Sequence, residues 1–206
     1  MKVLVIASRK GGVGKTTISA HLSVAAEAAG VGPVALIDTD PQASLAGWWN
    51  KREAPTPVFS TATTSSLKEH LAALKKAGVK LAIIDTPPAV TATIAAVIAQ
   101  ADLVLIPTRP SSLDLEAVGA TIELADAAKK RMIFVINGAA NRAKITGEAA
   151  VALSQHGTVA PVTLYQRTDF ASAMTDGRTA PEIAQASKAA EETSKLWQYV
   201  QAQLKR

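Results

Sequence analysis

The chain of 206 residues contains no cysteine, which excludes disulfides, thiolate metal sites and iron–sulfur clusters held by cysteine. Aromatic residues make up only 4% of the chain, and no apolar run is long enough to cross a bilayer. The first residues, MKVLVIASRKGG, resemble the start of a signal peptide, but the glycine-rich stretch at their end favours a buried first strand. These absences fit a cytoplasmic protein with an aliphatic core.

Short runs rich in Val, Ile and Leu alternate along the chain with stretches of helical pattern. The predicted strands are residues 3–7, 34–37, 81–84, 103–106, 133–136 and 159–164. The predicted helices are residues 16–29, 42–51, 66–77, 91–100, 114–128, 146–156 and 187–204, and residues 55–64 are expected to form an irregular edge or a short strand. Nearly continuous aliphatic strands are typical of a parallel sheet covered on both faces. The alternation therefore predicts one doubly wound α/β domain over residues 1–206, with a mainly parallel sheet flanked by helices.

The stretch SRKGGVGKTT, residues 8–17, lies between the first predicted strand and the first predicted helix. Gly14, Lys15 and Thr16 match the end of a phosphate-binding loop, although Arg9 occupies the position of its usual first glycine. Glycines allow backbone amides to approach phosphates closely, the lysine can reach the β- and γ-phosphates, and the threonine hydroxyl can ligate Mg²⁺. The residues predicted to contact a nucleotide here are Lys10, Gly11, Gly12, Val13, Gly14, Lys15, Thr16 and Thr17.

Three carboxylates follow predicted strands, Asp38 and Asp40 in ALIDTDPQ and Asp85 in LAIIDTPP. A single aspartate in such a place is often only a helix cap or a turn residue. Because the carboxyl ends of parallel strands meet at one edge of a sheet, these three carboxylates are expected to face the phosphate loop. Mg²⁺ and its bound waters explain such a group better than three separate turns do.

The stretch KGGVGKTT resembles the deviant Walker A motif of the ParA/MinD family of ATPases, and Lys10 matches the signature lysine of that motif. The resemblance implies that Lys10 reaches the nucleotide of an opposing subunit, so that two subunits sandwich two ATP molecules. DTDPQ and IIDTPP resemble two further family motifs. They imply that Asp40 orients or polarises the attacking water, and that Asp38 and Asp85 act around Mg²⁺. By this likeness the predicted catalytic residues are Lys10, Lys15, Asp38 and Asp40, and the predicted metal residues are Thr16, Asp38 and Asp85.

Two later stretches also resemble segments of this family. FVINGAANRA places Asn137 just past another predicted strand, where the family has an asparagine that contacts adenine, although an ordinary turn asparagine fits the position too. IPTRPSSLDL, residues 106–115, resembles a segment beside the family's dimer interface, and Asp114 in it can be a simple N-terminal helix residue.

The net charge of +5 is unevenly distributed along the chain. Residues 1–128 carry 11 Lys or Arg and 11 Asp or Glu, whereas residues 129–206 carry 11 and 6. Such an excess fits a polyanion partner, either nucleic acid or anionic lipid, and it fits an ordinary charged surface equally well. YQRTDFASAMTDGRTAPE and SKAAEETSKLW resemble the C-terminal part of small ParA-type partition ATPases, which implies non-specific DNA binding by an ATP-dependent homodimer. The candidate DNA contacts are Arg142, Lys144, Arg167, Arg178, Lys188 and Lys195.

The function expected from this resemblance is that of a nucleoid-associated ATPase that uses ATP and Mg²⁺ to position a plasmid, a chromosome region or a protein cluster. A ParB-like or other adaptor would stimulate its hydrolysis. One alternative is a MinD-like ATPase that binds membrane through its last helix, but docking of that helix on the core explains the same apolar stripe, Leu196, Trp197, Val200 and Leu204. A metabolic P-loop synthetase related to dethiobiotin synthetase is a further alternative. It would need a pocket for a small substrate, and no residues in the sequence suggest one.

Overall fold

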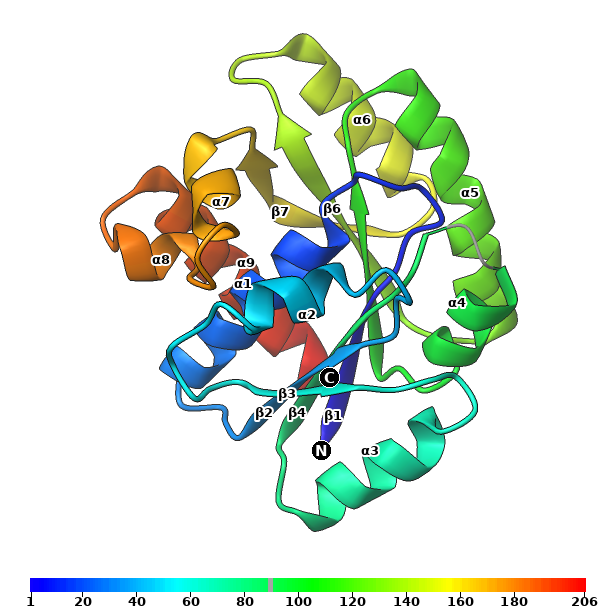
Figure 1. Cartoon of the computed structure of the whole chain (residues 1–206). Helices are drawn as coiled ribbons and strands as arrows, with labels where there is room; N and C mark the ends of the chain where they lie inside the picture. Colours follow the sequence, from blue (N-terminus) through cyan, green and yellow to red (C-terminus); the bar gives the residue numbers. More distant parts are fainter. Residues whose placement is uncertain (89–90) are drawn as a thin grey trace.

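The computed structural model describes residues 1–88 and 91–206. Its centre is a sheet of seven strands, in the order β3-β2-β4-β1-β5-β6-β7, in which every neighbouring pair is parallel (Figure 1). The strands are β1 (Lys2–Ile6), β2 (Val34–Asp38), β3 (Val58–Thr61), β4 (Leu81–Asp85), β5 (Leu103–Thr108), β6 (Met132–Ala139) and β7 (Thr158–Tyr165).

Helices connect the strands and cover both faces of the sheet (Figure 1). They are α1 (Lys15–Ala28), α2 (Ser44–Trp49), α3 (Leu67–Lys76), α4 (Thr91–Ile98), α5 (Ser112–Ala127), α6 (Lys144–Ser154), α7 (Thr168–Ala173), α8 (Ala180–Ile183) and α9 (Lys188–Leu204). Successive residues of a strand point to opposite faces, so Leu4 and Ile6 of β1 pack with α1, α2 and α9, while Val3 and Val5 pack with α3, α4, α5 and α6. The predicted doubly wound α/β fold is confirmed.

The short strand expected within residues 55–64 is β3, at one edge of the sheet. Several other predicted boundaries differ from the structure. The helix predicted from residue 42 begins only at Ser44, because Ala43 before it has a left-handed backbone with φ 54°. The placement of Asn137 just past a strand was wrong, since β6 continues to Ala139 and includes it. The short helices α7 and α8 lie in a stretch for which the sequence predicted no element.

The last helix, α9, docks on the core. Ser187 caps its start by accepting a hydrogen bond from the amide of Ala190 (3.1 Å). Its apolar stripe of Leu196, Trp197, Val200 and Leu204 is buried against the face that α1 and α2 share. The stripe is therefore part of the folding core, as the docked alternative predicted. In the described part of the chain, no helix combines the length and apolarity needed to cross a membrane.

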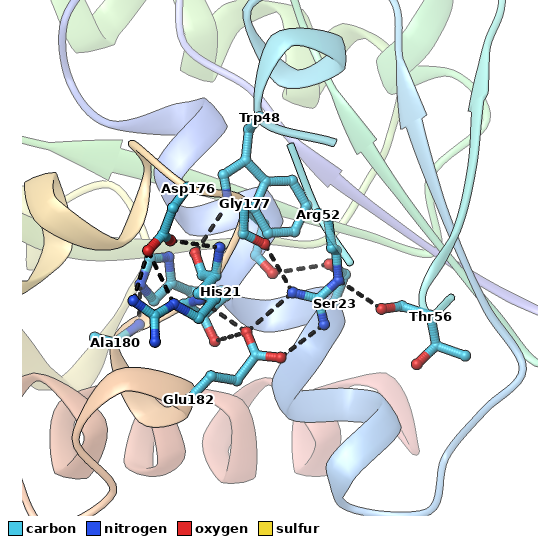
Figure 2. Close-up of polar contacts among 12 residues, drawn as sticks. His21, Ser23, Trp48, Arg52, Thr56, Asp176, Gly177, Ala180 and Glu182 are labelled. Atoms are coloured by element: carbon cyan, nitrogen blue, oxygen red, sulfur yellow. Dashed lines mark hydrogen bonds and ion pairs between the residues drawn. The ribbon is translucent and has the colours of Figure 1, made fainter. Parts of the chain in front are cut away.

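A buried arginine joins the end of α2 to the segment between α7 and α8 (Figure 2). The side chain of Arg52 is only 3% exposed and makes two bonds to the Glu182 carboxylate, of 2.7 and 3.0 Å. It also donates to the carbonyls of Thr56 (2.7 Å) and Gly177 (2.9 Å) and lies over the Trp48 ring at 5.3 Å. Gly177 has φ +81°, and a Cβ there would overlap the backbone of residues 51 and 52. Only glycine fits this close approach.

The same segment is also tied to α1 through a neutral histidine (Figure 2). His21 Nε2 accepts a hydrogen bond from the amide of Ala180 (3.0 Å), which leaves Nδ1 to donate to the carbonyl of Thr17 (2.8 Å). Burial lowers the pKa of His21 to about 4, so the ring is uncharged at neutral pH. Because α1 follows the phosphate loop and α2 follows Asp38 and Asp40, residues 176–182 are anchored to both elements that border the candidate site.

Replacing Arg52 by methionine is expected to lower the free energy of unfolding by about 3 kcal/mol, because Glu182 and two carbonyls then lose their buried donor. Urea unfolding of Arg52→Met and wild type measures this difference. Lys188→Met is the matched control, since Lys188 forms an exposed pair with Glu191 and should change stability little. Equal stability of Arg52→Met and Lys188→Met would contradict a structural role for the Arg52–Glu182 pair.

Candidate functional site

The loop between β1 and α1 forms a cradle of backbone amides at the end of the sheet where the strands finish (Figure 1). Gly12 and Gly14 have φ of 74° and 91°, a left-handed conformation that side chains disfavour. The N-terminus of α1 follows at Lys15, so free amides and the positive end of the helix point to the same place. This geometry fits an anion such as a phosphate.

The two lysines of the loop lie in different surroundings. Lys15 is 7% exposed, and its Nζ donates to the carbonyl of Lys10 (3.2 Å), which bridges the loop. Burial lowers the pKa of Lys15, an effect that the charges of Asp85 and Asp40 oppose. Lys10 is half-buried, and in residues 1–88 and 91–206 it makes no ion pair. One lysine is thus held inside the loop and the other is available at its rim.

Asp85, the last residue of β4, lies directly under the loop. Its side chain accepts hydrogen bonds from the hydroxyls of Thr16 (2.7 Å) and Ser19 (3.2 Å) in α1, and the residue is 1% exposed. Burial raises the pKa of Asp85 to about 7, helped by the charge of Asp38 and opposed by the two hydroxyls and Lys15. The sequence did not single out Ser19, whose spacing of three residues from Thr16 puts both hydroxyls on one helical face.

Asp38 and Asp40 lie beside Asp85 at the end of β2, since Asp38 pairs in register with Asp85. The Asp38 carboxylate accepts the amides of Asp40 (2.9 Å) and Ala46 (3.2 Å), and burial raises its pKa against these bonds. Asp40 is more exposed and accepts the amide of Gln42 (2.9 Å). Thr16, Asp38 and Asp85 offer the hard oxygen ligands that suit Mg²⁺. In the described ranges no three His, Cys, Asp or Glu side chains form a complete metal cluster, so phosphate or water oxygens would have to complete the shell.

Asn137 packs against the loop from β6. Its Nδ2 donates to the carbonyl of Val13 (2.7 Å), and a Cβ on Gly14 would overlap its amide. Asn137 also lines a cavity of about 200 Å³ beside the loop, bounded by Gly14, Thr17, Gln166 and Phe170 among others. The cavity is mostly apolar with a few polar groups, which is suitable for a flat base next to phosphates. Of its walls the sequence predicted Gly14, Thr17 and Asn137 as nucleotide contacts, whereas it gave no sign of the walls that come from β7 and α7.

A second cleft, of about 570 Å³, opens on the other side of Asp40. Its walls come from Asp38 and Asp40 and from a group of hydroxyl side chains, Thr39, Thr61, Thr63, Thr64, Ser66 and Thr93. The sequence showed no residues that suggest a small-substrate pocket, because these hydroxyls are distributed over the ends of three strands and the start of α3 and α4.

Most of the six candidate DNA contacts lie beside acidic side chains. Five of them are paired with acids: Lys144 with Glu148, Arg167 with Glu192, Arg178 with Asp176, and both Lys188 and Lys195 with Glu191. Arg142 makes no ion pair in the part of the chain that the structure describes. Arg167 also lines the 200 Å³ cavity beside Asn137. The role of these residues in DNA binding remains a prediction.

The chain is similar in sequence to proteins named ParA or named for carboxysome distribution. It is 38% identical to the maintenance of carboxysome distribution protein A of Gloeobacter kilaueensis over 60% of this chain and 56% of that protein. It is 36% identical to the protein ParA of Rhizobium radiobacter, over 60% of this chain and 56% of that protein. The aligned region therefore spans about half the length of each of these two relatives. A second maintenance of carboxysome distribution protein A, from Halothiobacillus neapolitanus, is 29% identical over 94% of this chain and 93% of its own length.

Solved structures share the fold. The cell division ATPase MinD of Pyrococcus furiosus superposes with a TM-score of 0.83, at 20% identity and over 98% of both chains. A Cyanothece McdA in complex with ATP superposes with a TM-score of 0.78, at 21% identity, over 100% of this chain and 96% of that one. The family model described as the CobQ/CobB/MinD/ParA nucleotide binding domain matches residues 4–180. Since this match covers the loop, all three carboxylates and Asn137, the chain belongs to the CobQ/CobB/MinD/ParA family of nucleotide-binding domains.

Proposed function

We propose that this chain is a ParA-type, Mg²⁺-dependent ATPase that forms an ATP-dependent homodimer, binds DNA without sequence preference and positions a cargo. The observation that carries the proposal is the pair of lysines in one phosphate loop. Lys15 is used inside the loop, while Lys10 is left at its rim without an acid partner in the described residues. A cation placed there can reach a phosphate outside its own loop, and an opposing subunit would supply that phosphate.

The chain's own residues account for nucleotide binding. The amides of residues 11–16 and the start of α1 would hold the β- and γ-phosphates, with Lys15 beside them. Thr16 would ligate Mg²⁺ directly, and Asp38 and Asp85 would hold its waters. Bound Mg²⁺ would neutralise charge on the phosphates. Asn137 would fix the base in the adjacent cavity, from the position where it already braces the loop.

Asp40 has the position needed to orient the attacking water. It is more exposed than Asp38 and Asp85, and it lies beyond Asp38 on the loop that leads to α2. A carboxylate so placed would orient a water for attack on the γ-phosphate. A ParB-like or other adaptor would increase the rate by completing the site, and the cargo would be a plasmid, a chromosome region or a protein cluster. The relatives include both a ParA and proteins named for carboxysome distribution, which supports a positioning role.

One observation favours a second candidate function. The 570 Å³ cleft beside Asp40 has room for a small substrate next to the γ-phosphate site, as a ligase that activates a carboxylate would need. Among the described residues that line it there is no cation to bind such a carboxylate, which favours the ATPase. ATP hydrolysis with and without DNA, with liposomes as a separate arm, tests the proposed function. Retention on liposomes rather than on DNA would favour the MinD-like alternative, which the buried stripe of α9 does not support.

The protonation of Asp85 should be visible in the stability of the nucleotide-free protein. The pKa of Asp85 is about 7 in the folded protein, against an ordinary value of 3.8, so the folded state binds this proton more tightly than the unfolded state does. As the pH rises from 4 to 7, ionised Asp85 therefore increasingly destabilises the fold. Asparagine does not titrate. The free energy of unfolding of Asp85→Asn relative to wild type should therefore rise over this interval by about 4 kcal/mol. Urea unfolding across this range measures the difference, and a difference that is independent of pH would contradict it. The titration of His21 changes stability with pH in the opposite direction, but it does so equally in both proteins and therefore cancels in the difference.

Lys10→Ala is expected to bind ATP but to lose ATP-dependent dimerisation. Two lysine–phosphate contacts vanish from each dimer, which should weaken it at least about tenfold. Sedimentation with a non-hydrolysable ATP analogue measures the dimer content. Lys15→Ala is the companion variant and should lose ATP binding itself, because it removes the cation inside the loop. An unchanged dimer content in Lys10→Ala would rule out the assigned role of Lys10.

Asp40→Ala is expected to bind ATP normally and to hydrolyse it about 10²-fold or more slowly, because the attacking water loses its acceptor. The result should be a long-lived ATP dimer on DNA, measured as steady-state phosphate release together with dissociation from DNA. Glu123→Ala, an exposed acid on α5, is the control and should leave turnover unchanged. Wild-type turnover in Asp40→Ala would show that Asp40 does not act on the water.

A further inference from the structure

The edge of the sheet at which the strands begin carries many lysines and arginines. We call this surface the basic edge, and define it by Lys2, Lys76, Lys80, Lys129, Lys130 and Arg131. Lys2 begins β1, Lys80 directly precedes β4, and residues 129–131 lead into β6. Lys76 ends α3, four residues before Lys80. In Figure 1 this is the end marked N, away from the loop that joins β1 to α1.

Backbone contacts show that these residues are neighbours. The amide of Lys2 donates to the carbonyl of Lys80 (2.9 Å), and the amide of Val104 in β5 donates to the carbonyl of Arg131 (2.9 Å). The strands β4, β1, β5 and β6 are consecutive in the sheet, so their four starts extend over about 15 Å. Arg131 also donates to the carbonyl of Gln203 (3.0 Å), which brings Lys205 and Arg206 at the end of α9 to the same edge.

The cations of the basic edge are free of ion pairs. Within residues 1–88 and 91–206, none of the six lies within 4.0 Å of a carboxylate, whereas five of the six candidates Arg142, Lys144, Arg167, Arg178, Lys188 and Lys195 are paired. Acids lie nearby as well: Asp102 accepts the amide of Val3 (2.7 Å), Glu27 accepts the amide of Val34 at the start of β2 (2.7 Å), and Asp126 is exposed at the end of α5. The negative end of a helix accounts for the presence of Lys76 and Lys129, which lie at the ends of α3 and α5. It does not account for Lys2, which lies in a strand.

We propose that the basic edge is the surface through which this protein binds the phosphate backbone of DNA. The proposal deepens the proposed function and rests on its DNA-binding part. The unpaired lysines of the edge can exchange their counterions for phosphates without first breaking an ion pair inside the protein. Long, mobile lysines over a 15 Å row can follow successive phosphates without reading bases, which fits binding without sequence preference.

The same surface fits DNA better than a membrane. A peripheral membrane site needs apolar side chains to insert between lipids in addition to cations. Of the exposed large apolar residues Val58, Leu113, Ile145, Val151 and Ile183, only Val58 begins a strand, and the apolar stripe of α9 is buried. The basic edge therefore offers charge without an apolar anchor.

The test compares two triple variants with equal change of charge. The edge variant carries Lys76→Gln, Lys80→Gln and Lys129→Gln, and the control variant carries Lys144→Gln, Lys188→Gln and Lys195→Gln. All six lysines are exposed and none belongs to the nucleotide site. Binding to a duplex of arbitrary sequence is measured by fluorescence anisotropy with a non-hydrolysable ATP analogue at several salt concentrations. Sedimentation verifies that both variants still dimerise.

The edge variant should bind DNA about 10²-fold more weakly at 0.1 M salt, and the slope of log K against log salt should fall by about 3. The control variant should behave like wild type. Equal losses in both variants, or a loss in the control alone, would overturn the proposal while leaving DNA binding intact. A wild type that binds no DNA in any nucleotide state would instead refute the DNA-binding part of the proposed function, and this proposal with it. Loss of binding to vesicles containing phosphatidylserine, without loss on DNA, would assign the edge to membrane and overturn the proposal.

Discussion

The parallel direction of all seven strands determines where chemistry can occur in this protein. Since every strand finishes at the same edge, the last residues of β2 and β4 meet the loop that follows β1. Asp38 and Asp85 are in register on neighbouring strands, and the hydroxyl of Thr16 reaches Asp85 from the first turn of α1. An antiparallel sheet would distribute these residues over both ends. The candidate site is thus a consequence of topology, and its residues come together although Thr16 and Asp85 are 69 positions apart and Val13 and Asn137 are 124 positions apart.

Much of this edge was predictable because its signals are local. A glycine-rich loop between a strand and a helix is continuous in sequence, and carboxylates directly after aliphatic runs show where the strands end. The parts that were missed depend on contacts between distant segments. The sequence analysis did not single out Arg52, whose side chain is buried and pairs with Glu182 130 positions away. Asn137 was predicted just past a strand, because nothing local shows that β6 continues as far as Ala139. Local pattern does not encode such long-range packing.

The site is electrostatically strained in the protein alone. Burial raises the pKa of Asp85 to about 7 and also raises that of Asp38, while burial lowers the pKa of Lys15. Each of these groups is held in surroundings that disfavour its charged form, and two carboxylates lie next to each other. A divalent cation and a triphosphate would relieve both effects at once, since the cation pairs with the acids and the phosphates pair with the lysine. Such a site favours binding of the two ligands together over binding of either alone.

The distance between the two edges bears on how nucleotide could control DNA binding. Strands of five to eight residues separate the phosphate loop from the basic edge by roughly 17 to 26 Å. The cations of the basic edge come from the starts of strands and from the ends of α3 and α5, not from the loop that would hold nucleotide. Pairing two subunits through their loops would place one basic edge at each end of the dimer. The two weak, salt-sensitive surfaces of one dimer would then bind DNA at the same time wherever DNA is dense. Because the second contact would be intramolecular, its high effective concentration would strengthen overall binding without a new contact. In such an arrangement hydrolysis would release DNA by separating the subunits, and no conformational signal would have to cross the sheet.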